Sequence, residues 1–462
     1  MELRLIRQQL PLTIIKFAIP SIFSMILTSS LSIIDGYFIG NFIGKSALSA
    51  VNIGLPFSFF NLAIGIMVGV GGVSQASQLI GANKHKLSNC IFNQTLLTGL
   101  VLLVISAMLS SVLISPISEQ IKLEVAVRQH FIDYYSLIIF AYPLAMLNVI
   151  GGMFVRAEGN PNIPLVLSII SVVLNASLDY TLVVHFNFGV KGIAIASVIS
   201  VLVNSIYLFS YIRTKSRIFN IQRFVLSRAV LVDTFKNGSS EFIGQFSICI
   251  TTITLNHTIV TTGGVDSLTA YTLVNYSGYL FTMIVIGLAQ ASATLVGYSY
   301  GASDYGLAKK VRNFSIIYVT ILGLLSMLFL LLNVDRYSLL FIDNNHVGEV
   351  ARSGIPYYSI MFLFVGTNII TSFYYTSVGN VLASTAISAA RGLVILLACI
   401  LILPKFCGVK AIWLIAPTTE LLTFFISCWL LAKEEACPEV LETTLSNQST
   451  KMIPSTTRTD YD

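Results

Sequence analysis

The sequence predicts an all-α membrane protein: twelve transmembrane helices in two six-helix bundles related by a parallel pseudo-two-fold repeat. Three observations predict this fold. Hydrophobic residues make up 55% of the 462 residues and charged residues only 10%, whereas a soluble domain carries roughly 25% charged residues. Twelve continuous apolar runs are each long enough to span a bilayer, which takes about 20 residues. Short loop motifs recur at a nearly constant spacing along the chain.

The apolar runs define the expected spans. This composition argues against a soluble enzyme. The continuity of the runs argues against an outer-membrane barrel, whose strands alternate apolar and polar residues. The first run is too long for the apolar core of a signal peptide and lacks a small-residue cleavage site. In chain order the spans cover residues 12–39, 47–78, 91–114, 131–155, 162–184, 191–212, 233–261, 267–297, 312–334, 354–377, 383–404 and 410–432.

The chain repeats itself at an offset of 219 or 220 residues. Gly189-Val190-Lys191-Gly192-Ile193 recurs as Gly408-Val409-Lys410-Ala411-Ile412, and Gly159-Asn160 recurs as Gly379-Asn380. A constant offset across several loops indicates duplication. Because each copy holds six spans, an even number, both copies enter the membrane from the same side. This is the parallel repeat found in transporters whose two bundles rock about a central cleft.

The repeat sets the expected domain limits. We expect an N-terminal six-helix lobe over residues 1–212 and a C-terminal six-helix lobe over 233–432. Between them, 213–232 forms a basic cytoplasmic linker and the natural hinge between the bundles. Residues 433–462 form a polar cytoplasmic tail.

Lysine and arginine are distributed unevenly among the loops. If the N-terminus is cytoplasmic, the outer loops hold eight of the 27 Lys and Arg residues and the inner regions hold the other 19. Cytoplasmic loops carry such an excess of positive charge. We therefore predict a multi-pass protein of the plasma (inner) membrane with both termini in the cytoplasm. The net charge of +6 then reflects these loops and not a nucleic-acid partner.

Several motifs resemble those of the multidrug and toxic compound extrusion (MATE) family, over about residues 10–432. The motifs are Asp35-Gly36-Tyr37-Phe38-Ile39-Gly40 at the end of the first helix, Arg156-Ala157-Glu158-Gly159-Asn160-Pro161 in the 4–5 loop, Asn175 with Leu178-Asp179-Tyr180 in the fifth helix, Gly189 to Ala194 in the 5–6 loop, and Arg391 with Trp413 to Pro417 in the last two helices.

The resemblance favours the MepA-like branch and implies a twelve-helix, two-lobe exporter. Such an exporter exchanges cationic or amphiphilic compounds for inward H⁺ or Na⁺. Some family members carry coupling acids on helices 7 and 10 of the second lobe. Here the tenth span holds no acid between Ile360 and Gly379. We therefore expect the coupling site in the first lobe.

Acidic residues at bilayer depth are the best candidates for functional residues, because placing each charged side chain there costs a free energy on the order of 3 kcal/mol or more. Four acids lie well inside spans: Asp35, Asp179, Glu241 and Glu420. Asp35 lies five residues before the outer end of span 1, and Asp179 lies six residues before the outer end of span 5. At 1.5 Å per residue, their depths agree within about 2 Å. Asn175 lies one helical turn before Asp179 and shares its face.

Asp35, Asn175 and Asp179 are therefore expected to line one cavity in the outer half of the first lobe. Two carboxylates in a desolvated site cannot both stay ionised cheaply, so the pair would hold a proton or share a Na⁺. The alternative is a helix-capping or structural role for these acids. Asn148 and Ser197, on spans 4 and 6, are weaker candidates for the same cavity, because polar residues in spans usually join helices by hydrogen bonds.

The second lobe holds the other two acids. Glu241, with Gln245 one turn on, could face a cationic substrate, or Glu241 could pair with Lys236. Glu420 in span 12 lies at a depth comparable to Arg391 in span 11, which predicts a buried structural ion pair. A role of that pair in binding a substrate carboxylate is the alternative.

The sequence holds no Walker A motif, no supported catalytic set and no metal-ligand spacing, so we expect neither an enzyme nor a cofactor. Energy must come from an H⁺ or Na⁺ gradient or from the substrate's own gradient. The expected partners are small amphiphilic or cationic substrates and membrane lipids, with no nucleic acid, and the chain is expected to be a monomer. Two alternatives remain: a flippase for lipid-linked oligosaccharides or polysaccharides, and a non-transporting receptor or channel.

Overall fold

The computed structural model describes residues 7–120, 124–339 and 345–436, and over these residues it contains helices and no strand. Ten continuous helical segments are long and apolar enough to cross a membrane. Two of them, Arg228–Gly301 and Val381–Ala436, are 74 and 56 residues long. Non-helical backbone breaks them at Gly264 (φ 77°) and Gly408 (φ 55°). The described chain therefore crosses twelve times, which confirms the predicted fold class.

The helices follow the expected spans closely. In the first lobe they are α2 (Leu10–Phe38), α3 (Lys45–Ile53), α4 (Leu55–Gly81), α5 (His85–Gln120), α6 (Val125–Ala157), α7 (Asn162–Asp179) and α8 (Gly189–Thr214). In the second lobe they are α9 (Arg228–Gly301), α10 (Tyr305–Leu332), α11 (Val334–Leu339), α12 (Asn345–Tyr358), α13 (Phe362–Ser377), α14 (Val381–Ala389), α15 (Ile395–Cys407) and α16 (Ala411–Ala436). The α16 helix continues into the expected tail, and residues 437–462 lie outside the described part.

The duplication is visible in the backbone. Of the nine residues with positive φ in the described chain, all but Asn187 form pairs 219 or 220 positions apart: Gly44 and Gly264, Asn83 and Ser303, Gly159 and Gly379, Gly189 and Gly408. Positive φ marks places where the chain must turn sharply. The two lobes therefore share their turn geometry as well as their loop motifs.

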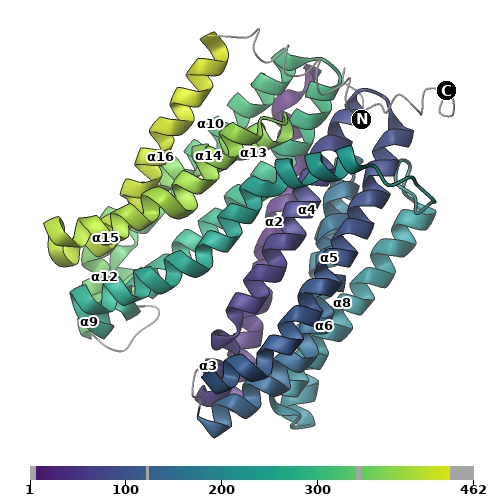
Figure 1. Ribbon diagram of the computed structural model, residues 1–462. Coiled ribbons are helices and arrows are strands. Elements are labelled where there is room, and N and C mark those ends of the chain that lie inside the picture. The colour runs from purple at the N-terminus through teal and green to yellow at the C-terminus, as the bar shows by residue number, and fades with distance from the viewer. Residues whose placement is uncertain (1–6, 121–123, 340–344, 437–462) are drawn as a thin grey trace.

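The two lobes meet at one end of the molecule. Figure 1 shows them close together where α2 begins and α16 ends, and diverging toward the opposite end, where α3 and α15 lie. We call the first the joined end and the second the parted end. At the joined end, a β-carbon on Gly81 would lie 2.0 Å from the Tyr298 carbonyl oxygen, and one on Gly301 would lie 1.8 Å from that of Gln78. These contacts are reciprocal at the 220-residue offset, so the repeat axis passes between them.

The segment between the lobes, predicted as a basic linker and hinge, is bonded to the first lobe. It has neither helix nor strand from Ser216 to Ser227 and lies along α5. Asn93 donates to the Asn220 carbonyl oxygen (2.8 Å), and Gln94 donates to that of Ser227 (2.6 Å). The amides of Asn220 and Ser227 donate back to Asn89 and Gln94. The linker is thus bound to the first lobe up to the start of α9.

Candidate coupling site

Both aspartates of the predicted site lie next to widened helical turns. Asp35 lies near the end of α2, which continues as a π-helical turn over Ile39–Ile43. Asp179 is the last residue of α7, and a second π-helical turn follows over Tyr180–His185. Such turns are uncommon and often occur at functional sites, because they change the direction of side chains within a helix.

The structure brings the three predicted residues together. The Asp35 carboxyl lies close to the Asp179 carboxyl and to the Asn175 side chain. Asp179 is fully buried and Asn175 is 2% exposed. The Asn175 amide donates to Ser197 Oγ on α8 at 3.4 Å. Ser197 therefore joins the cluster, and Tyr134 of α6 lies within electrostatic range of both aspartates.

The cluster has acceptor oxygens without donors. Asp35 Oδ1, Asn175 Oδ1 and both Asp179 carboxyl oxygens are buried and accept no hydrogen bond from the described residues. Buried polar atoms are normally bonded, and each unbonded one costs free energy. A proton between the two carboxyls, or a hard cation among these oxygens, would satisfy them. Within the described chain there is no cluster of three or more His, Cys, Asp or Glu side chains able to hold a metal.

Asn148 is not brought to this cluster. Its amide nitrogen donates to the Val201 carbonyl oxygen at 3.1 Å, and its amide oxygen accepts from Ser205 at 3.0 Å. Both partners lie on α8, so Asn148 joins α6 to α8, the ordinary task of a polar side chain between membrane helices.

In the second lobe, the charges of Arg391 and Glu420 meet. Arg391 Nε donates to Glu420 Oε1 at 2.6 Å, and Asn368 Nδ2 donates to Glu420 Oε2 at 2.8 Å. Asn368 in turn accepts from Ser427 at 2.9 Å. The Glu420 carboxylate is therefore fully bonded, in contrast to the aspartates of the first lobe.

A family profile decides what kind of protein this is. The MatE profile matches residues 20–181 and again residues 242–401, so it finds the two halves of the repeat separately. The chain belongs to the MatE family.

Relatives and solved structures agree with this MATE assignment. The chain is 24% identical over 362 residues to the multidrug export protein MepA of Staphylococcus saprophyticus, covering 76% of this chain and 79% of that protein. It is 23% identical over 386 residues to MepA of Staphylococcus aureus strain MRSA252, covering 82% of this chain and 84% of that protein. A multidrug resistance MATE family transporter in an outward-facing conformation superposes with a TM-score of 0.86 at 20% identity, covering 92% of this chain and 96% of that one.

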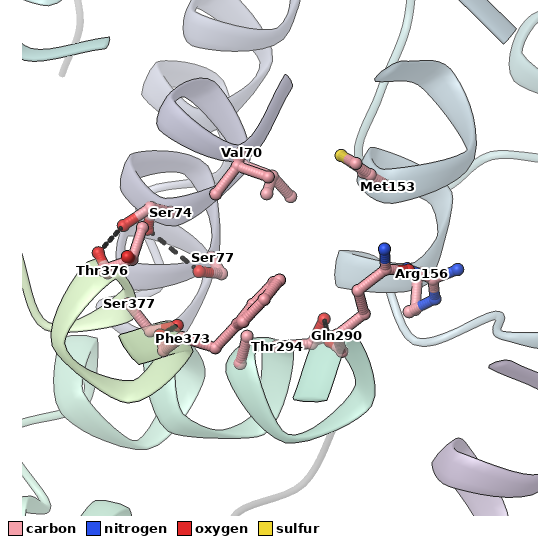
Figure 2. Close-up of a pocket in the computed structure, with 12 residues that line it drawn as sticks. Val70, Ser74, Ser77, Met153, Arg156, Gln290, Thr294, Phe373, Thr376 and Ser377 are labelled. Atoms are coloured by element: carbon pink, nitrogen blue, oxygen red, sulfur yellow. Dashed lines mark hydrogen bonds between the residues drawn. The ribbon is translucent and has the colours of Figure 1, made fainter. Parts of the chain in front are cut away.

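In this MATE transporter the repeat axis also passes through a small cavity of about 30 Å³ between the lobes. Ten of its twelve lining residues form pairs at the 220-residue offset: Val70 and Gln290, Val73 and Ala293, Ser74 and Thr294, Met153 and Phe373, Arg156 and Thr376. Figure 2 shows Ser74, Ser77 and Thr376 on one side of it and Met153 and Arg156 on the other.

Sequence reasoning gave Arg156 no role, although the residue begins a family motif. It is 4% exposed, and its Nη1 donates to Gln290 Oε1 of the other lobe at 2.6 Å. Ser74 donates to the Thr376 carbonyl oxygen at 2.7 Å, and Gln78 donates to that of Ser377 at 2.6 Å. These carbonyls belong to the last turn of α13, where helical carbonyls lack partners within the helix. The joined end is thus closed by hydrogen bonds between the lobes.

Proposed function

We propose that this MATE transporter exports cationic or amphiphilic compounds from the cytoplasm in exchange for inward H⁺ or Na⁺. It would work as a monomer in the plasma membrane with both termini cytoplasmic, which makes the joined end the inner end. The names of the relatives, multidrug export proteins, support the export of small molecules. The observation that supports the coupling is the proximity of Asp35 and Asp179, three of whose four carboxyl oxygens are buried without a hydrogen-bond donor among the described residues.

The coupling step follows from electrostatics. With both carboxylates ionised, Asp35 on α2 and Asp179 on α7 repel each other in a site with little water. A proton or Na⁺ from outside removes that repulsion and lets α2 and α7 pack together. The π-helical turns beside each acid give the helices a place to change register. Binding of the ion would thereby change the shape of the first lobe, and the ion would be released when the joined end opens.

Export from inverted membrane vesicles tests this function. Asp35→Asn and Asp179→Asn are each expected to lower gradient-driven uptake of a cationic dye at least tenfold. Asp133→Asn is the matched control, because Asp133 is an acid of the same lobe that pairs with Lys191 at 3.4 Å. Replacing Na⁺ by K⁺ at fixed pH tells which ion is coupled. Full activity of both variants would overturn the coupling role.

A further inference from the structure

A stripe of four residues on the first half of α9 faces the first lobe. Thr234, Gly238, Glu241 and Gln245 follow one another at spacings of three and four, so they lie on one side of the helix. The first two touch the opposite lobe: a β-carbon on Gly71 would lie 1.9 Å from the Thr234 carbonyl oxygen, and one on Gly238 would lie 1.9 Å from that of Met67. Glu241 and Gln245 continue the same stripe toward the parted end.

The facing surface of α4 is apolar. Phe60, Ile64, Met67 and Gly71 lie on one side of α4 by the same spacing rule. Because Gly71 meets Thr234 and Met67 meets Gly238, α4 runs antiparallel to this part of α9. Ile64 and Phe60 therefore continue opposite Glu241 and Gln245, where the lobes diverge (Figure 1). All four of these side chains are partly exposed, so each can be reached from outside the protein.

The charge at this place comes from three residues. Arg391 packs beside α9, since a β-carbon on its neighbour Gly392 would lie 3.7 Å from Gly244 Cα. Arg391 is within electrostatic range of Glu241, yet its hydrogen bond goes to Glu420 at 2.6 Å. No ion pair joins Glu241 to Lys236 among the described residues, and the charged group that acts on Glu241 is Arg391. With all three ionised, Glu241, Arg391 and Glu420 carry a net charge of −1.

We infer that Glu241 and the apolar face of Phe60 and Ile64 form a binding site for amphiphilic cations, and that the Arg391–Glu420 pair sets its preference for a single positive charge. The acid attracts the cation, and the aromatic and aliphatic side chains cover its apolar groups. The positive charge of Arg391 balances the negative charge of Glu420. The remaining negative charge of Glu241 therefore neutralises one positive charge of the ligand and not two. This inference rests on the proposed export of cations and adds the residues that select them.

A charge-compensation series tests the inference on purified protein. Equilibrium dialysis would give the Kd of tetraphenylphosphonium, a monocation, and of decamethonium, a dication. Arg391→Gln changes the site charge to −2 and is expected to shift the ratio of the two Kd values about tenfold toward the dication, as a unit charge a few ångströms away would do in a partly hydrated site. Glu420→Gln removes the net charge and is expected to weaken binding of the monocation about tenfold.

The double variant Arg391→Gln/Glu420→Gln restores a charge of −1 and is expected to restore the wild-type preference. A purely structural role of the pair predicts that the Kd values of both ligands change together at a constant ratio. A constant ratio in Arg391→Gln, or no return of the ratio to its wild-type value in the double variant, overturns the inference. Arg352→Gln is the matched control, because Arg352 pairs with Asp335 at 2.6 Å on the exposed surface. Glu241→Gln should weaken both ligands, and unchanged binding would also overturn the inference. Export by the unaltered protein is measured separately in vesicles. Failure of the proposed function can therefore be distinguished from failure of this inference.

Discussion

At the scale of single residues, the two lobes fill equivalent positions with different chemistry. In the first lobe Phe92 packs edge-to-face on Phe154 at 5.1 Å. The residues 220 positions later are Arg312 and Tyr374, and the Arg312 guanidinium lies over the Tyr374 ring at 4.9 Å. Glu434 accepts from Tyr374 at 2.6 Å and pairs with Arg312 at 3.4 Å. Where the first lobe has an aromatic contact, the second lobe thus has a buried ionic network that binds the end of α16.

Removing Glu434 should therefore destabilise the second lobe. Arg312 is 1% exposed, and loss of Glu434 leaves this buried charge only the exposed Glu435 as a carboxylate partner, at 3.1 Å. We expect Glu434→Ala to cost roughly 3 kcal/mol, measured as a lower melting temperature of the detergent-solubilised protein. Glu435→Ala is the control, because the Glu435 side chain is 61% exposed and such pairs contribute about 1 kcal/mol or less. Equal melting temperatures for the two variants would contradict this account.

Individual residues were predictable where the membrane makes their charge costly. Asp35, Asp179, Arg391 and Glu420 stand out in apolar runs, and each now lies against another charged residue of that set. Glu434 was placed in the polar tail, because sequence alone locates the end of a helix only within a few residues. The packing of Arg156 against Gln290 depends on how the lobes meet, and no local pattern in the sequence encodes that.

At the scale of elements, the segment Ser216–Ser227 is held as a strap and not as a loose connection. Glu158 binds its start, accepting from Ser216 at 2.7 Å and from the Ile218 amide at 3.1 Å. Phe219, which is 1% exposed, packs on Phe92 and Phe154. The sequence predicts this segment as a basic linker and the hinge between the bundles. The sequence signal for its attachment to the first lobe is the group of three amide side chains Asn89, Asn93 and Gln94 on α5.

Loosening the strap should expose it to protease. Asn93→Ala removes the bond to the Asn220 carbonyl and the one from the Gln222 amide at 3.2 Å. At about 1 kcal/mol per hydrogen bond, the two bonds contribute about 2 kcal/mol, so the fraction of open linker should rise roughly thirtyfold. Limited trypsin digestion after Arg217 and Arg223 measures this rise. Asn220→Ala is the control, because only the backbone of Asn220 takes part in these bonds. If both variants are cut at the wild-type rate, the hydrogen bonds of Asn93 do not restrain the linker.

At the scale of the whole molecule, the duplication predicted from loop motifs has a mechanical consequence. The lobes touch near the repeat axis at the joined end through backbone contacts of Gly81 and Gly301, and they diverge at the other end (Figure 1). Two stiff bundles that share one contact region can rock about it, as parallel-repeat transporters do. The offset of 220 residues could be read from the sequence. The sequence does not tell which end of the molecule is closed, because both rocking states bury similar helix faces.

A wedge at the joined end should therefore move the parted end. A β-carbon on Gly81 would lie 2.0 Å from the Tyr298 carbonyl oxygen, and backbone cannot yield as a flexible side chain does. Gly81→Leu should push the lobes apart there and favour the state that opens toward the joined end. Spin labels on Asn41→Cys and Thr261→Cys, exposed and equivalent positions at the parted end, would report the change in a background without the six native cysteines. The population of short label distances should rise. Gly306→Leu is the control, because a β-carbon there meets only the Asp304 side chain at 3.9 Å. Unchanged distances in Gly81→Leu would mean that the lobes do not rock as rigid bodies about this contact.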